Sequence, residues 1–139
     1  MNKYMETAIL EAKTAYSEGN VPVGAVIVKN DEIISKAHNT KNSTNVSINH
    51  AEILAIKDAC EKLNTWHLED CSIYVTLSPC DMCLAAIAES RISKVYYLLD
   101  SNYADNLLKK IYDINLVKLN DSEQYSMLIS NFFENMRKK

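Results

Sequence analysis

Two short groups of metal-binding residue types constrain the fold of this chain more than any other feature of its sequence. The first is HAE at residues 50–52, and the second is PCDMC at residues 79–83. Each group stands at the start of a predicted helix. Two thiolates three residues apart on a first helical turn can bind one ion, and the helix dipole favours their thiolate form. His50 adds a nitrogen only if the fold brings the two helix starts together.

The chemistry of these side chains favours a catalytic zinc site. His50, Cys80 and Cys83 offer one nitrogen and two sulfur ligands, which suit zinc and leave its fourth position for water. Glu52 follows His50 by two residues and is placed to take a proton from that water. With Pro79 before the first cysteine, the two groups form the pattern of zinc-dependent deaminases. The alternative, a core histidine with two buried thiols, leaves Glu52 at a helix start without a role.

The remaining cysteines and histidines lack the spacing of metal ligands. Cys60 lies on the apolar side of a predicted helix and Cys71 is in phase with the apolar residues of a predicted strand, so both are expected to be core thiols. His38 and His67 are expected to be structural or surface residues. A disulfide scaffold does not fit, because a chain of 139 residues is long enough to form a core without one.

Hydrophobic periodicity predicts a regular series of helices and strands. Helices are expected over residues 3–18, 51–63, 81–90, 102–112 and 122–137, and strands over residues 21–28, 32–37, 71–77, 94–99 and 114–119. Residues 39–49 are expected to form one loop. Ser78 is expected to cap the helix at 81–90, with Pro79 in its first position. The apolar stripe of the helix at 51–63 is expected to be Ile53, Ile56, Cys60 and Leu63.

This order of elements predicts an α/β fold. A hairpin of the first two strands opens the sheet and helical crossovers add the others, which gives a five-stranded mixed sheet with helices on both faces. The helix before the last strand permits a right-handed parallel crossover. The expected architecture is a three-layer α/β/α sandwich that forms a single domain over residues 1–139.

Composition narrows the classes of function. Hydrophobic residues make up 47% and charged residues 24%, with a net charge of −3, so the chain is globular and is not a strongly basic nucleic-acid binder. Two glycines exclude the glycine-rich phosphate loops. No apolar run is long enough to span a membrane, and the N-terminus lacks the apolar core of a signal peptide. A soluble cytoplasmic protein without membrane contact is therefore expected.

Further segments of the chain resemble the bacterial tRNA adenosine deaminases, within the cytidine-deaminase-like superfamily. The resemblance covers nearly the whole chain and rests on NVPVGAV at residues 20–26, HN at 38–39, YVTL at 74–77, SRI at 90–92 and FF at 132–133. Members of this family convert the wobble adenosine of a tRNA anticodon to inosine. The resemblance implies a zinc-dependent hydrolytic deaminase that acts on the tRNA anticodon loop. It also implies a homodimer and no organic cofactor.

The resemblance also implies roles for individual residues. Glu52 would carry protons, Asn39 would hydrogen-bond the purine and Val23 would lie against the base. The target base would be flipped into the pocket, which costs less in an anticodon loop because the base is already unpaired. The zinc ligands would be His50, Cys80 and Cys83.

Three departures from the family pattern keep other functions open. Ser78 stands where the family usually has glutamate, and residues 48–49 stand where it usually has a Thr-Ala pair. A glycine-containing loop that helps shape the RNA side of the site is missing after the strand at 94–99. One alternative is a deaminase of a free base or nucleoside, with cytosine or guanine as the base. The other is a non-catalytic zinc protein or RNA-binding subunit.

Overall fold

The computed structural model describes residues 2–101, 108–120 and 122–138 and confirms the expected α/β architecture. The elements, in chain order, are α1 (Lys3–Ser17), β1 (Gly24–Lys29), β2 (Glu32–His38), α2 (Lys41–Thr44), α3 (Ala51–Leu63), β3 (Cys71–Leu77), α4 (Asp81–Glu89), β4 (Lys94–Leu99), α5 (Leu108–Ile111), β5 (Asn115–Lys118) and α6 (Glu123–Arg137). The sheet has the strand order β2-β1-β3-β4-β5. β1 is antiparallel to β2 and β3, whereas β3, β4 and β5 run parallel, so the sheet is mixed.

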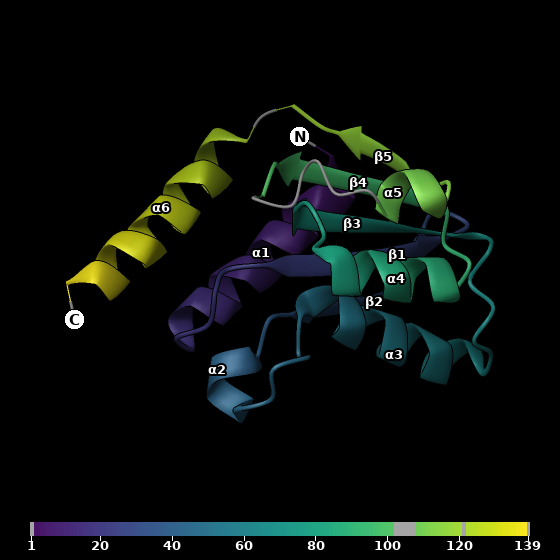
Figure 1. Ribbon diagram of the computed structural model, residues 1–139, viewed down its shortest axis with the longest axis horizontal. Helices are drawn as coiled ribbons and strands as arrows, with labels where there is room; N and C mark the ends of the chain where they lie inside the picture. The colour runs from purple at the N-terminus through teal and green to yellow at the C-terminus, as the bar shows by residue number, and fades with distance from the viewer. Residues whose placement is uncertain (1, 102–107, 121, 139) are drawn as a thin grey trace.

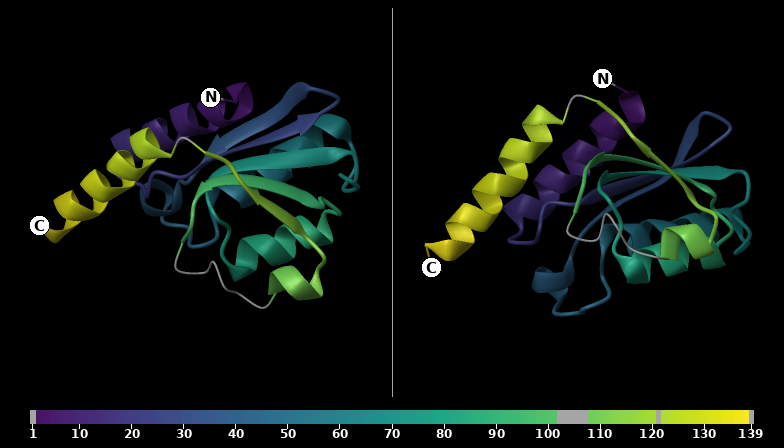
Figure 2. Two further views of the ribbon diagram at one scale, coloured as in Figure 1. Left: turned by 90° about the horizontal axis from the view of Figure 1, so that it is seen from above. Right: turned by 45° about the horizontal axis from the view of Figure 1, so that its top comes forward.

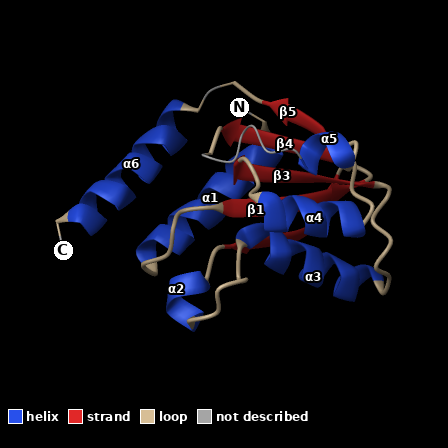
Figure 3. Cartoon of the chain, viewed as in Figure 1, coloured by secondary structure: helices blue, strands red, loops and turns tan. Residues whose placement is uncertain are grey.

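Helices cover both faces of the sheet (Figure 1; Figure 3). α3 and α4 lie side by side on one face, with α5 next to α4, and α1 lies on the other. α6 lies beside α1 on that second face, and its C-terminal half extends beyond the sheet (Figure 2). Among the described helices, none is long and apolar enough to cross a membrane.

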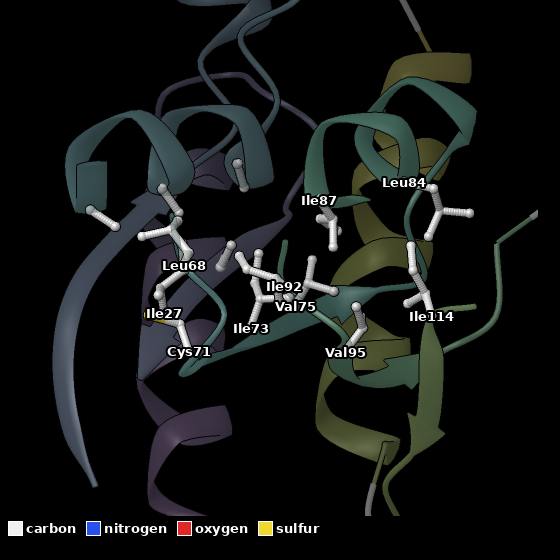
Figure 4. Close-up of a cluster of buried hydrophobic side chains, with 14 of the residues drawn as sticks. Ile27, Leu68, Cys71, Ile73, Val75, Leu84, Ile87, Ile92, Val95 and Ile114 are labelled. Atoms are coloured by element: carbon white, nitrogen blue, oxygen red, sulfur yellow. The ribbon is translucent and has the colours of Figure 1, made fainter. Parts of the chain in front are cut away.

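The larger core lies between the sheet and the α3–α4 layer. Figure 4 shows Ile27, Ile73 and Val75 of the sheet beneath these helices, with Ile87 of α4 above them. A second core on the opposite face packs α1 and Tyr125 of α6 against the sheet. Each face of the sheet is thus closed by apolar side chains, and this burial is the main stabilising contribution to the fold.

α1 lies so close to β1 that only glycine fits at one contact. A Cβ atom on Gly24 would stand 1.9 Å from the carbonyl oxygen of Ala8 and 2.8 Å from the backbone nitrogen of Ala12. The first residue of β1 therefore touches the helix backbone directly. This contact fixes the start of β1, next to the cavity described below.

Several boundaries differ from the prediction. β1 begins at Gly24 and not at residue 21, because Pro22 has no N–H group for strand pairing. Residues 39–49 are not all loop, since they contain the short helix α2. Of the helix expected over 102–112, residues 108–111 form α5 and residues 102–107 lie outside the described part of the chain. The buried side of α3 also differs: it carries Ala51, Glu52, Ala55 and Ala59, while the predicted apolar stripe is partly buried beside it.

Candidate active site

The two motif groups meet at the end of the sheet where β3 and β4 terminate, and they lie at the N-terminal ends of α3 and α4. His50 is the N-cap of α3, and Cys80 is the N-cap of α4. Both caps have extended backbone, so each helix begins directly after its ligand-type residue. Cys83 lies in the first turn of α4 and is fully buried. The parallel arrangement of the two helices thus brings together residues that are 30 or more positions apart.

The nitrogen and sulfur atoms of this group are arranged around one point. Nδ1 of His50 lies 3.5 Å from Sγ of Cys83 and 3.8 Å from Sγ of Cys80, and the potential ligand atoms all lie within 4.8 Å of one another. One nitrogen and two sulfurs at this separation fit a zinc ion. In the described part of the chain no other group of three such residues occurs.

The two thiols differ in protonation. The Cys83 thiol donates a hydrogen bond to Cys80, which with His50 lowers the pKa of Cys80 to about 4 despite partial burial. The same hydrogen bond and its own burial raise the pKa of Cys83. The hydrogen bond with Cys80 also raises the pKa of His50. Cys80 is therefore a thiolate at neutral pH, as a soft metal ligand must be.

Glu52 is a carboxyl group buried beside these residues, with 4% of its surface exposed. Burial raises its pKa to about 7, although the nearby His50 opposes the shift. A side chain with such a pKa both accepts and releases protons readily near neutral pH, as a general acid–base group must.

A cavity of about 190 Å³ opens in front of these groups. Its walls come from the start of β1 and the ends of β2, β3 and β4, and it is lined by Val21, Val23, Asn39, Lys41, His50, Ala51, Glu52, Leu77, Ser78, Cys80 and Ser101. All six predicted site residues except the buried Cys83 thus border one space. The sequence did not indicate Lys41 or Ser101, because each lies outside the motifs and enters the wall only through the fold.

Backbone contacts hold the predicted substrate residues in the wall. The N–H group of Asn39 donates to the carbonyl oxygen of Val23 at 3.0 Å, which ties the end of β2 to the segment before β1. Oδ1 of Asn39 accepts a hydrogen bond from the backbone N–H of Lys41 at 2.8 Å. This bond fixes the orientation of the Asn39 amide, whose Nδ2 group remains to donate elsewhere.

The predicted capping role of Ser78 is wrong. α4 begins at Asp81, so its N-cap is Cys80, and Ser78 belongs to the segment that leaves β3. The Ser78 hydroxyl accepts from the backbone N–H of Ser101 at 2.9 Å and lies 2.9 Å from the Ser101 hydroxyl. Ser78 therefore joins the ends of β3 and β4 in the cavity wall.

The other cysteines and histidines lie away from the cavity. Cys71 is buried and Cys60 is half-buried, both in the core between α3 and the sheet, and neither forms a disulfide. Both ring nitrogens of His38 contact carboxylates of α1 and its C-cap, at 3.1 Å and 2.8 Å. His67 lies on the surface beside Glu69. Their structural or surface placement was expected.

Comparison with known proteins agrees with the geometry. Residues 1–99 match the family described as the cytidine and deoxycytidylate deaminase zinc-binding region. A tRNA-specific adenosine deaminase of Aquifex aeolicus (strain VF5) is 45% identical over 96% of this chain and 94% of its own length. A structure from a study of A-to-I editing by tRNA:A34 deaminases is 32% identical and covers 84% of this chain and 96% of its own, with a TM-score of 0.77.

Another solved structure has a different named activity. Guanine deaminase from Bacillus subtilis is 29% identical over 100% of this chain and 96% of its own, with a TM-score of 0.67.

The match to the family spans well over half of the chain, and the curated relative covers almost all of it. The chain therefore belongs to the zinc-binding cytidine and deoxycytidylate deaminase family and, within it, to the tRNA-specific adenosine deaminases.

Proposed function

We propose that this protein is a zinc-dependent hydrolytic deaminase that converts the wobble adenosine of a tRNA anticodon to inosine. The observation that carries the proposal is that one cavity of about 190 Å³ borders the N/S ligand group, the buried Glu52 and Asn39. A cavity below the roughly 300–1,000 Å³ of drug-sized pockets suits one flipped base. The named activity of the Aquifex aeolicus relative supports this substrate.

Glu52 carries the protons in the proposed reaction. His50, Cys80 and Cys83 would hold the zinc, which when bound makes water a nucleophile at neutral pH. Glu52 takes a proton from the attacking water and delivers it to N1 of the adenine, and a further proton transfer lets ammonia leave. Water is consumed and ammonia is released, so adenosine becomes inosine without an organic cofactor.

Asn39 and Val23 hold the base in the proposed complex. The Asn39 amide, oriented by the Lys41 N–H, donates from Nδ2 to an acceptor nitrogen of the purine. Val23 is 8% exposed and supplies an apolar surface against the ring. An anticodon loop presents its bases unpaired, so the cost of flipping is small.

We further propose that the protein works as a homodimer. Exposed apolar side chains lie next to the ligand residues in the chain: Ile48 is 53% exposed and Met82 is 36% exposed. Covering such residues in a second copy would remove them from water. Light scattering is expected to give twice the 15.7 kDa of one chain. A mass of one chain at micromolar concentration would refute the dimer.

Inosine formation tests the function directly. Zinc-loaded protein is incubated with an anticodon stem-loop that carries adenosine at the wobble position, and inosine is measured by mass spectrometry. Inosine is expected with the wild type and not with Glu52→Gln. A stem-loop with guanosine at that position is the substrate control. Folded, zinc-loaded protein that forms no inosine would contradict the proposal.

Deamination of a free base is the second candidate. It is favoured by the guanine deaminase that matches the full chain and by Ser78 in the cavity wall. Ammonia release from free guanine and cytosine is measured beside the stem-loop assay. Activity on a free base without activity on RNA would favour this candidate over tRNA editing.

A further inference from the structure

α2 is capped by a residue from a distant part of the chain. Its own N-cap, Thr40, makes no side-chain capping bond. Instead, Oδ1 of Asn20, in the connection between α1 and β1, accepts from the backbone N–H of Asn42 at 2.8 Å and of Ser43 at 3.0 Å. Nδ2 of Asn20 donates to the Ser43 hydroxyl at 3.0 Å. The side chain of Asn20 therefore does for α2 what an N-cap residue does within its own helix.

The position of Asn20 leaves it little freedom. Its exposed fraction is 0%, and its backbone N–H donates to the carbonyl oxygen of Ala15 at the end of α1. Nδ2 of Asn42 donates to the carbonyl oxygen of Gly19 at 3.1 Å, which adds a second tie between the two segments. In Figure 1, α2 accordingly lies beside the C-terminal end of α1.

α2 in turn sets one wall of the cavity. Lys41, its first residue, lines the cavity, and the Lys41 N–H orients the Asn39 amide. The first turn of α2 thus has two side-chain acceptors: Asn39 accepts from the N–H of Lys41, and Asn20 accepts from those of Asn42 and Ser43. Asn20 therefore holds the turn that carries the Lys41 N–H. Without this cap the N–H groups of Asn42 and Ser43 would lose their side-chain acceptor, which destabilises the start of a helix.

We propose that Asn20 is a positioning residue for the deamination: by capping α2 it fixes Asn39 in the geometry that binds the base. Asn20 does not line the cavity and acts through Asn39. The inference rests on the proposed function, because its effect is read on the same substrate.

A double-mutant cycle tests the coupling of the two residues. Asn20→Ala is expected to lower kcat/KM for the stem-loop about tenfold, the effect of one lost oriented hydrogen bond. In an Asn39→Ala background the same change is expected to have less than about a twofold effect, since the residue through which it acts is gone. Equal effects in both backgrounds would overturn the proposal and leave a purely structural role.

Rescue and a matched control separate positioning from stability. Asn20→Asp keeps the acceptor oxygens for both N–H groups and is expected to restore kcat/KM to within about threefold of the wild type. Ser35→Ala removes another buried hydrogen bond, from Ser35 Oγ to the Ala55 carbonyl oxygen at 2.8 Å, away from the cavity. It is expected to lower Tm by about 3–6 °C, as Asn20→Ala does, without changing kcat/KM. A loss of kcat/KM in Ser35→Ala equal to that in Asn20→Ala would overturn the proposal.

Two outcomes distinguish the inference from the function beneath it. If the zinc-loaded wild type forms no inosine, the proposed function fails. If the wild type is active and Asn20→Ala is folded with unchanged kcat/KM, only the inference fails. Where Asn20→Ala does not fold, Asn20→Ser, whose hydroxyl is too short to bridge both N–H groups, takes its place in the cycle.

Discussion

Glu52 is the residue on which the proposed chemistry depends most. It is buried, and its pKa is raised to about 7 by that burial. Glu52→Gln preserves the size and burial of the side chain but removes its ability to accept a proton. We expect kcat to fall by about 10²–10⁴-fold, the usual contribution of a general acid–base group. Zinc content, measured by atomic emission, is expected to stay at the wild-type level, whereas activity within tenfold of the wild type would refute the role.

The two buried cysteines allow a matched test of the metal site. Cys83 faces Nδ1 of His50 at 3.5 Å, whereas Cys71 packs in the core at the start of β3. Cys83→Ala is expected to lose most bound zinc and all activity, because two ligands remain. Cys71→Ala is expected to keep zinc and to lose only about 1 kcal/mol of stability, as one buried group is deleted. Metal analysis and urea unfolding measure both effects. Loss of zinc in both variants, or in neither, would contradict the assignment.

At the scale of elements, the contact between α1 and β1 gives a sharp prediction. Gly24→Ala would place a methyl group 1.9 Å from the Ala8 carbonyl oxygen, so the helix must move away from the strand. We expect a loss of about 3 kcal/mol in the free energy of unfolding, at the upper end of overpacking effects.

Gly19→Ala is the control for this contact. Gly19 has φ of +81° but nothing within 4 Å of an added Cβ, so only the cost of the left-handed backbone applies. That cost is about 1–2 kcal/mol. Urea unfolding compares the two variants, and a smaller loss at Gly24 than at Gly19 would contradict the packing argument.

The helices and strands differ in how well the local sequence predicts them. α3, β3 and β4 have the bounds that periodicity predicts, because each has a regular apolar pattern bounded by local stop signals. α2 could not be predicted, since KNST is a poor helix former and its cap comes from Asn20, far away in the chain.

The residues of the candidate site also fall into those that local sequence predicts and those that it does not. The residues of the two motifs were found because their types and spacing are specific to zinc chemistry. Lys41 and Ser101 were not found, because they reach the cavity only when strand ends from different parts of the chain meet. Ser78 was assigned to the wrong contact, since its actual partner, Ser101, is 23 residues further along the chain.

At the scale of the whole molecule, a buried hydrogen bond joins the N-terminal and C-terminal parts. The hydroxyl of Tyr125 in α6 donates to the carbonyl oxygen of Pro22 at 2.7 Å, and Tyr125 is 0% exposed. Pro22 precedes Val23 of the cavity wall, so α6 supports the site from behind although it does not line it.

Tyr125→Phe removes only this hydroxyl. We expect a loss of about 1–2 kcal/mol in the free energy of unfolding, because the buried Pro22 carbonyl loses its donor. Tyr4→Phe deletes a similar bond, to the Asp31 carbonyl oxygen at 2.7 Å, at an exposed site. Its expected cost is below about 0.5 kcal/mol. Chemical unfolding compares the two, and equal losses would show that burial does not decide the value of the bond.

The bond between Tyr125 and Pro22 also sets an order of events during synthesis of the protein on the ribosome. The two residues are separated by 103 positions. At about 5–20 residues per second, Tyr125 is made roughly 5–20 seconds after Pro22. Throughout this interval α1 and the first strands lack Tyr125, one of the buried side chains of the core that they share with α6. The segment that holds Val23 therefore gains its support from α6 only at the end of synthesis, after the residues that line the cavity have all been made.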